Sequence, residues 1–125
     1  MEFRLARHTN RLEEIIDFYT NALGFNILGD FQAHDGYDGV FIGLPDGNWH
    51  LEFTSTNEPV MHHFDEHDLL VFYPQTQDDY QQILTSFKNN EVAEEVPKNP
   101  YWRANGKMFK DPDGLGIIIS SLKCV

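Results

Sequence analysis

NRLEEIIDFYTNALGF, residues Asn10 to Phe25, places its apolar residues at the spacing of an amphipathic helix. They fall at i, i+3, i+4, i+7, i+10 and i+11 and share one face: Leu12, Ile15, Ile16, Tyr19, Ala22 and Leu23. Asn10 is suited to cap the first turn, with Glu13 reaching back as in a capping box. Gly24 is suited to end the helix in a left-handed conformation. The stretch therefore predicts a helix that covers one side of a sheet.

Segments with strand character surround this helix in the first half of the chain: Phe3–His8, Phe25–Phe31, Tyr37–Leu44 and Trp49–Thr54. The first and the last of them alternate in polarity. Arg4 and His8 therefore share one face of the first strand, and His50 and Glu52 share one face of the last. We expect a sheet with one face under the helix and one face of more polar character.

The second half repeats this order. A polar connection, 55–67, leads to a strand at Leu69–Tyr73 and to a helix that Thr76 caps, with its inward face at Tyr80, Ile83, Leu84 and Phe87. Further strands are expected at Val92–Val96, Trp102–Lys110 and Leu115–Leu122, the last two joined across the turn 111–114. The chain therefore predicts one α+β domain, 1–125, in which a strand–helix–three-strand unit is used twice. Unit one spans about 1–56, a linker about 57–67 and unit two about 68–125.

The charge balance excludes two classes of partner. The chain has 20 acidic and 9 basic residues and a formal net charge of −11. Such a charge repels phosphate backbones and anionic lipids, so we expect no nucleic-acid and no membrane partner. The sequence shows no signal-peptide layout, and its single cysteine, Cys124, allows no disulfide within the chain. We expect a soluble protein of the cytoplasm.

Two motifs carry a resemblance. Ile16-Asp17-Phe18-Tyr19 is followed by Leu23-Gly24-Phe25, and Phe109-Lys110-Asp111-Pro112-Asp113-Gly114 precedes an apolar strand. Together with the duplication, these motifs resemble the vicinal oxygen chelate superfamily, also called the glyoxalase/bleomycin-resistance/dioxygenase group, and look most similar to its small YycE-like bacterial members. The resemblance implies two βαβββ units whose curved mixed sheets form an open, barrel-like cleft, and it implies a homodimer.

Enzymes of this superfamily hold a divalent metal in the cleft, with one ligand from the first and the last strand of each unit. The resemblance puts these positions at Arg4, Glu52, Asp68 and Ile118. Arg4 stays protonated, and Ile118 has no donor atom. A unit charge about 3 Å from a divalent ion costs on the order of 10 kcal/mol at an effective dielectric near 20. We therefore expect no cofactor, with Arg4 in the place of the metal, between Glu52 and Asp68.

Other residues keep alternatives open. His8 and His50 share the polar face with Glu52, so a displaced zinc, manganese, nickel or iron site of these three residues is an alternative. Glu52 is also the candidate catalytic residue, as a general base. Phe72, expected on the face of Asp68, is the expected contact for a flat apolar ligand, with Phe41, Tyr101, Trp102 and Phe109 as further aromatic candidates. The tract His62–Asp68 is interpreted as a solvated loop.

The leading hypothesis for function is a protein that binds a small molecule without a metal, as the resemblance to bleomycin-resistance-type sequestering proteins implies. Its cleft would be lined by Arg4, His8, His50, Glu52, Asp68, Phe72 and Ile118. The first alternative is a metal-dependent lyase, thiol transferase or dioxygenase. The second is a non-catalytic scaffold whose own side chains fill the cleft. The sequence leaves open whether the protein is an enzyme.

Overall fold

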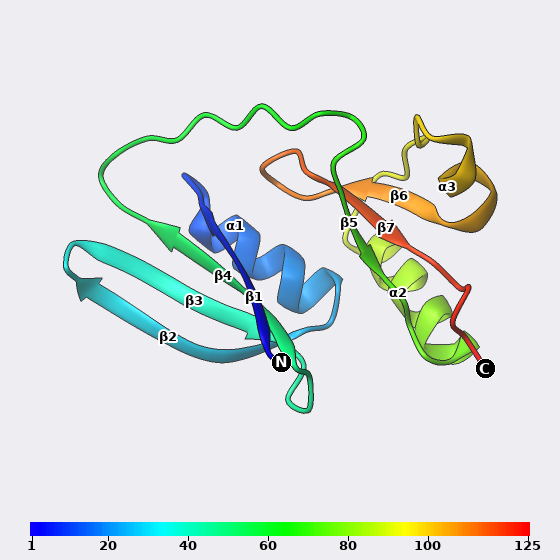
Figure 1. Cartoon of the computed structure of the whole chain (residues 1–125), viewed down its shortest axis with the longest axis horizontal. Helices are drawn as coiled ribbons and strands as arrows, with labels where there is room; N and C mark the ends of the chain where they lie inside the picture. The colour runs from blue at the N-terminus through cyan, green and yellow to red at the C-terminus, as the bar shows by residue number, and fades with distance from the viewer. The chain divides into compact units, whose positions relative to one another are not determined.

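The computed structural model describes all residues, 1–125. The chain forms two compact units, residues 1–61 and 62–125, and each unit combines one sheet with helices (Figure 1). None of the helices has both the length and the apolar character that crossing a bilayer requires.

Unit one contains a four-stranded sheet and one helical segment. In chain order its elements are β1 (Phe3–His8), α1 (Leu12–Asp17), the π-helical turn η1 (Phe18–Ala22), β2 (Asn26–His34), β3 (Tyr37–Gly43) and β4 (Trp49–Ser55). The strand order is β1-β4-β3-β2, with β1 parallel to β4 and the other neighbours antiparallel. The strands expected from the sequence in this half are confirmed, with β2 extending to His34.

The predicted helix is confirmed over Leu12–Ala22, and Gly24 follows it with a φ of +90°. The predicted cap is wrong. Arg11 is the N-cap residue and makes no side-chain cap, whereas the side chain of Asn10 binds the backbone of Val60. Asn10 donates to the Val60 carbonyl at 2.6 Å and accepts from the Val60 amide at 2.9 Å. Asn10 therefore ties the end of unit one to the start of its helix.

The helical segment covers one face of this sheet. The core on that face consists of Ile15, Tyr19, Val40, Ile42, Leu51 and Phe53, all buried. The rings of Tyr19 and Phe53 lie 5.1 Å apart. Because side chains alternate along a strand, His50 and Glu52 of β4 point to the opposite face. The fold of unit one therefore separates an apolar, helix-covered face from a polar one.

Unit two contains a three-stranded sheet. Its elements are β5 (Leu69–Phe72), α2 (Gln77–Asn89), α3 (Pro100–Asn105), β6 (Lys107–Lys110) and β7 (Gly116–Ile119). The order is β5-β7-β6, with β5 parallel and β6 antiparallel to β7. The Thr76 cap is confirmed, because its side chain accepts from the Asp79 amide. Phe87 of α2 is fully buried, and its ring lies 4.5 Å from that of Phe109 on β6.

Two strand predictions in unit two are wrong. Val92–Val96 forms only one bridge, between Glu95 and Met108, and Trp102 belongs to α3 instead of a strand. The reason for α3 is local. The side chain of Asn99 accepts from the Tyr101 amide, and a proline opens the helix.

The α+β class is confirmed: both sheets mix parallel and antiparallel strands, and there is no closed barrel. The order β5-β7-β6 repeats β1-β4-β3, and the bridge of Glu95 to Met108 stands where β2 pairs with β3.

Candidate functional site

The face of the unit-one sheet opposite its helix gathers polar and aromatic side chains. Arg4, Ala6 and His8 of β1 pair with His50, Glu52 and Thr54 of β4, and Phe41 of β3 pairs with Glu52. Paired residues of neighbouring strands point to the same side of a sheet. We call this surface the Arg4 face and define it by six residues: Arg4, Ala6, His8, Phe41, His50 and Glu52.

Arg4 is the centre of this face. Its Nε–H donates to His50 Nε2 at 2.8 Å, and its NH1 group donates to Glu52 Oε1 at 3.1 Å. Its guanidinium carbon lies 5.0 Å from the centre of the Phe41 ring. The Arg4 side chain is 51% exposed and that of Glu52 is 16% exposed. The expected ion pair of Arg4 with Glu52 is therefore present, whereas the bond to His50 was not expected.

The bond from Arg4 fixes the protonation of His50. Because the Nε–H of Arg4 donates, His50 Nε2 accepts with its lone pair. The imidazole is then the neutral tautomer with its proton on Nδ1, as assigned from this hydrogen bond. Both neighbours of the guanidinium are thus acceptors, and Arg4 carries the only positive charge of the three.

His8 belongs to a different set of contacts. Its Nδ1 lies 2.8 Å from Thr54 Oγ1, its Nε2 lies 3.1 Å from Thr56 Oγ1, and the Tyr37 ring stands edge-on at 6.0 Å. Both ring nitrogens therefore have hydroxyl partners. Alternation already placed Thr54 on the polar face, but Thr56 lies beyond the strand, and only the fold brings it to His8.

The structure does not assemble the alternative metal set of His8, His50 and Glu52. Nowhere in residues 1–125 do three or more His, Cys, Asp or Glu side chains come close enough to hold one ion. The tract His62–Asp68 is no exception. Asp65 Oδ1 accepts from the amide and from Nδ1 of His67, at 2.8 and 3.0 Å.

Hydrogen bonds and ion pairs in this tract also shift the pKa values of its side chains. The bonds from the backbone and the ring of His67 lower the pKa of Asp65. Lys98 Nζ lies 2.7 Å from Glu66 Oε2 and lowers the pKa of Glu66, while Glu66 raises the pKa of Lys98. These exposed carboxylates already have partners within the chain.

The strand register corrects the predicted grouping in unit two. Val71 pairs with Ile118 and Leu69 with Gly116, whereas Phe72 pairs with Ile119. Ile118 therefore shares a face with Leu69 and Val71, and Phe72 points to the other side. The expectation that Phe72 and Ile118 line one face is wrong, because Val71, one residue earlier, pairs with Ile118. With Ile118 aligned to Glu52, as the resemblance implies, this register aligns Leu69 with Arg4, because Leu69 pairs with Gly116 as Arg4 pairs with His50.

Asp68 lies just before β5, and its carboxylate accepts from the Asp65 amide at 3.3 Å. Phe72 lies on the face of Ile117, whose partner Phe109 contacts α2. Tyr101 and Trp102 contact each other edge-on within α3, 4.9 Å apart. Of the aromatic candidates, the structure therefore places Phe41 beside Arg4. Phe31, whose ring lies 5.8 Å from Phe41, was not predicted from the sequence.

These positions do not fit a divalent metal. Of the four positions that the resemblance implies, Arg4 and Ile118 have no donor atom for a cation, which leaves Glu52 and Asp68, whereas catalytic metal sites usually have three protein ligands. Arg4 adds a fixed positive charge in direct contact with Glu52. The side chains at these positions therefore do not support a reaction step through a bound metal.

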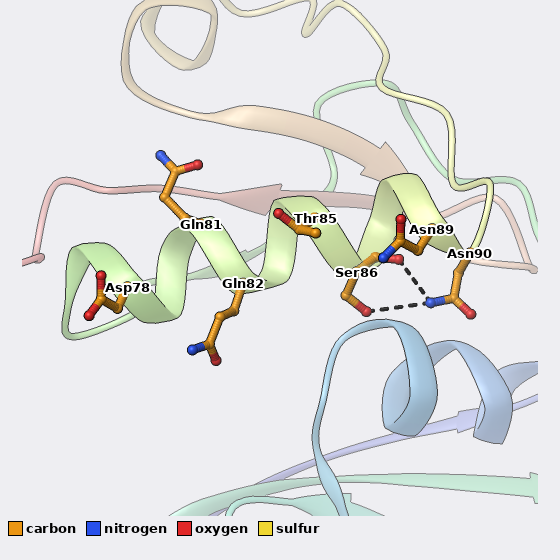
Figure 2. Close-up of a pocket in the computed structure, with 7 residues that line it drawn as sticks. All are labelled: Asp78, Gln81, Gln82, Thr85, Ser86, Asn89 and Asn90. Atoms are coloured by element: carbon orange, nitrogen blue, oxygen red, sulfur yellow. Dashed lines mark hydrogen bonds between the residues drawn. The ribbon is translucent and has the colours of Figure 1, made fainter.

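A hollow of about 460 Å³ lies along α2, lined by Asp78, Gln81, Gln82, Thr85, Ser86, Asn89 and Asn90. Figure 2 shows these side chains projecting in different directions from the helix and not toward one point. The amide nitrogen of the Asn90 side chain donates to the Ser86 carbonyl at 2.8 Å. The hollow has neither an aromatic nor a basic side chain, and we assign it to solvated helix surface.

Each half of the chain matches a family model, and the whole chain is similar to a bacterial protein whose structure is known. The family model "YycE-like N-terminal domain" matches residues 3–54, and the "YycE-like C-terminal domain" matches residues 67–121. The YycE protein of Bacillus subtilis is 39% identical over 126 aligned residues, which cover 98% of this chain and 88% of that protein. A crystal structure of YycE from the same organism has a TM-score of 0.85 at 37% identity, covering 99% of this chain and 91% of that one.

Two more distant structures share the fold. Glyoxalase I of Leishmania major, a trypanothione-dependent enzyme, has a TM-score of 0.73 at 19% identity, covering 96% of this chain and 85% of that one. TnmS3, an antibiotic-binding protein from Streptomyces, has a TM-score of 0.69 at 21% identity, covering 97% of this chain and 94% of that one. At these identities the likeness concerns the fold alone.

Proposed function

Since the chain belongs to the YycE-like family of the vicinal oxygen chelate superfamily, we propose that it binds a small molecule at the Arg4 face without the metal of that superfamily. The observation that carries the proposal is the position of the Arg4 guanidinium, in contact with Glu52, His50 and Phe41. We further expect a homodimer and a cytoplasmic location.

Electrostatic repulsion disfavours a metal at this face. Arg4 does not lose its proton in a protein, and it lies 3.1 Å from the one carboxylate that could bind a cation. An ion bound at Glu52 would meet this charge at a cost on the order of 10 kcal/mol, at a separation near 3 Å and an effective dielectric near 20. Ile118, which the resemblance also implies as a ligand position, has no donor atom.

The composition of the face favours a small organic ligand. Binding sites for small molecules combine apolar and aromatic walls with a few polar groups that fix orientation. The Arg4 face offers the Phe41 ring, the small side chain of Ala6, and the polar groups of Arg4, His50 and Glu52. Among the relatives by fold, glyoxalase I is trypanothione-dependent and TnmS3 binds an antibiotic, which supports a small organic molecule as the ligand.

The test has a metal arm and a ligand arm. Protein purified without a chelating column is analysed for metals by mass spectrometry, and a fragment library is screened by ligand-observed NMR. We expect well under one equivalent of divalent metal, and ligands whose signals depend on Arg4. In Arg4→Gln these signals should vanish, while Arg11→Gln should keep them, because Arg11 is an exposed arginine paired with Glu14 in the same unit. One equivalent of bound divalent metal in the unmodified protein would refute the proposal in favour of a metalloenzyme.

A further inference from the structure

The contacts of Arg4 also restrict the chemical class of ligand that the Arg4 face can take, provided that the proposed function is correct. We propose that the face takes an organic carboxylate with a flat apolar part, and that the carboxylate docks on the open edge of the Arg4 guanidinium.

Arg4 has more hydrogen-bond donors than the protein uses. A guanidinium has five N–H groups. Arg4 uses two of them within the protein, one to His50 and one to Glu52, so three remain. These three belong to the two terminal nitrogens, NH1 and NH2, which form the edge that pairs with both oxygens of a carboxylate. With the Arg4 side chain 51% exposed, solvent and ligand can reach this group.

The Arg4 side chain is held in one orientation. The guanidinium carbon lies 5.0 Å from the Phe41 ring centre, and the Nε and NH1 groups are each bonded to a neighbouring strand residue. A long flexible side chain normally loses freedom when it binds a ligand, and for Arg4 much of that loss has already occurred on folding. The fixed fork favours a planar, two-oxygen acceptor over a single carbonyl.

The unused N–H groups of Arg4 favour a hydrogen-bond acceptor on the ligand. His50 Nε2 accepts from Arg4 and cannot accept from a ligand as well, and Glu52 Oε1 is likewise bonded to Arg4. The remaining capacity of Arg4 is for acceptors alone. A bidentate carboxylate gains charge-assisted hydrogen bonds, which are stronger than those of a neutral amide.

Aromatic and small side chains beside Arg4 suit a flat apolar part. The Phe31 and Phe41 rings lie 5.8 Å apart, tilted by 48°, and neither is fully buried. Ala6, the residue between Arg4 and His8 on this face of β1, is exposed and small. A flat ring attached to the carboxylate can therefore lie beside these side chains.

Glu52 gives the proposal its distinctive signature. Its carboxylate repels an anion bound at Arg4, so a second carboxylate on the face lowers the affinity. Glu52→Gln removes that repulsion and keeps the size of the side chain. The two variants should therefore act in opposite directions: Arg4→Gln weakens carboxylate binding, and Glu52→Gln strengthens it. A role for the pair in structure alone would make both variants weaker binders.

The experiment uses the full chain and two matched probes, benzoate and the neutral benzamide, titrated by two-dimensional NMR at 0.15 M salt, about physiological ionic strength. We expect saturable shifts of the Arg4-face amides with benzoate, with an affinity about tenfold to a hundredfold lower in Arg4→Gln, the range of a charge-assisted hydrogen bond. Glu52→Gln should raise the affinity severalfold. Arg11→Gln should leave it unchanged, and benzamide should bind more weakly and respond to none of the three variants.

Folding is checked by circular dichroism, and Arg4→Lys is a second variant that keeps the charge but lacks the fork; it should give an intermediate loss. If benzamide binds as well as benzoate, or if library ligands bind at Arg4 while benzoate does not, the carboxylate inference is wrong and the proposed function stands. If neither the probes nor the library bind at the Arg4 face, both are wrong.

Discussion

The substitution Arg4→His should create a zinc site from His50, Glu52 and the new imidazole. Arg4 now contacts His50 Nε2 at 2.8 Å and Glu52 Oε1 at 3.1 Å, so two potential ligand atoms already contact the same guanidinium group. An imidazole at position 4 lies directly across the parallel ladder from His50. The change replaces a permanent cation with a third donor, and two histidines with one carboxylate are a suitable set for zinc.

The size of the effect follows from two opposing contributions to stability. Losing the ion pair of Arg4 with Glu52 costs at most about 1 kcal/mol, because the arginine is half exposed and such pairs are screened. At a free zinc concentration of about 100 times Kd, binding stabilises the folded state by about 2.7 kcal/mol. For a chain of this length, about 3–5 °C of Tm corresponds to each kcal/mol. We therefore expect zinc to raise the Tm of the variant by about 8–13 °C.

The assay is thermal unfolding by circular dichroism with zinc and then with excess EDTA, which should reverse the shift. Arg11→His is the matched control and should gain nothing, because it places a histidine away from the Arg4 face. Adding Glu52→Gln to Arg4→His should remove most of the shift. The reasoning is refuted if zinc raises the Tm of the unmodified protein by the same amount, or if zinc does not raise the Tm of the folded variant.

The remaining predictions concern stability and ionisation. Asn10→Ala removes both hydrogen bonds to the Val60 backbone, so we expect the free energy of unfolding to fall by about 1 kcal/mol. Proteolysis near Val60 should become faster, and an unchanged digestion pattern would contradict this. Lys98→Met should raise the pKa of the Glu66 carboxyl toward 4.5 in an NMR titration, while Lys88→Met should not. Because the pKa of Glu66 is lowered from 4.5 and that of Lys98 is raised from 10.5, their ion pair stabilises the folded state throughout the pH range from 4.5 to 10.5. It should fade as pH falls below about 4.5 through the lowered pKa of Glu66, and as pH rises above 10.5 through the raised pKa of Lys98.

Where local pattern and local structure agree, prediction from the sequence succeeded. The apolar spacing between Leu12 and Ala22 predicted the helix, and the Thr76 cap needed only its own first turn. In β1 and β4, regular alternation of polar and apolar residues indicated which side chains share a face of each strand, and the resemblance then placed Arg4 beside Glu52. The Asn10 cap failed because its side chain found backbone partners 50 residues away.

The errors in unit two have two different causes. Trp102 was expected in the hairpin that crosses the turn 111–114, whereas Asn99 and the following proline are a local signal for the start of a helix. The error in the phase of β5 has a different cause, because no local signal sets this phase. Leu69–Phe72 is apolar at every position, so alternation carries no information there, and pairing with β7 alone decides which residues share a face with Ile118.

The sequence by itself determined the α+β class and the duplication, because these depend on residue identity and short-range periodicity. The position of Arg4 at a place where superfamily enzymes hold a metal was implied by the resemblance. Only the tertiary structure decided that His50 accepts from Arg4, that Phe41 lies beside its guanidinium, and that Phe72 points away from the face of Ile118. Those facts depend on strand register, and the pairings of β1 with β4 and of β5 with β7 join residues more than forty positions apart.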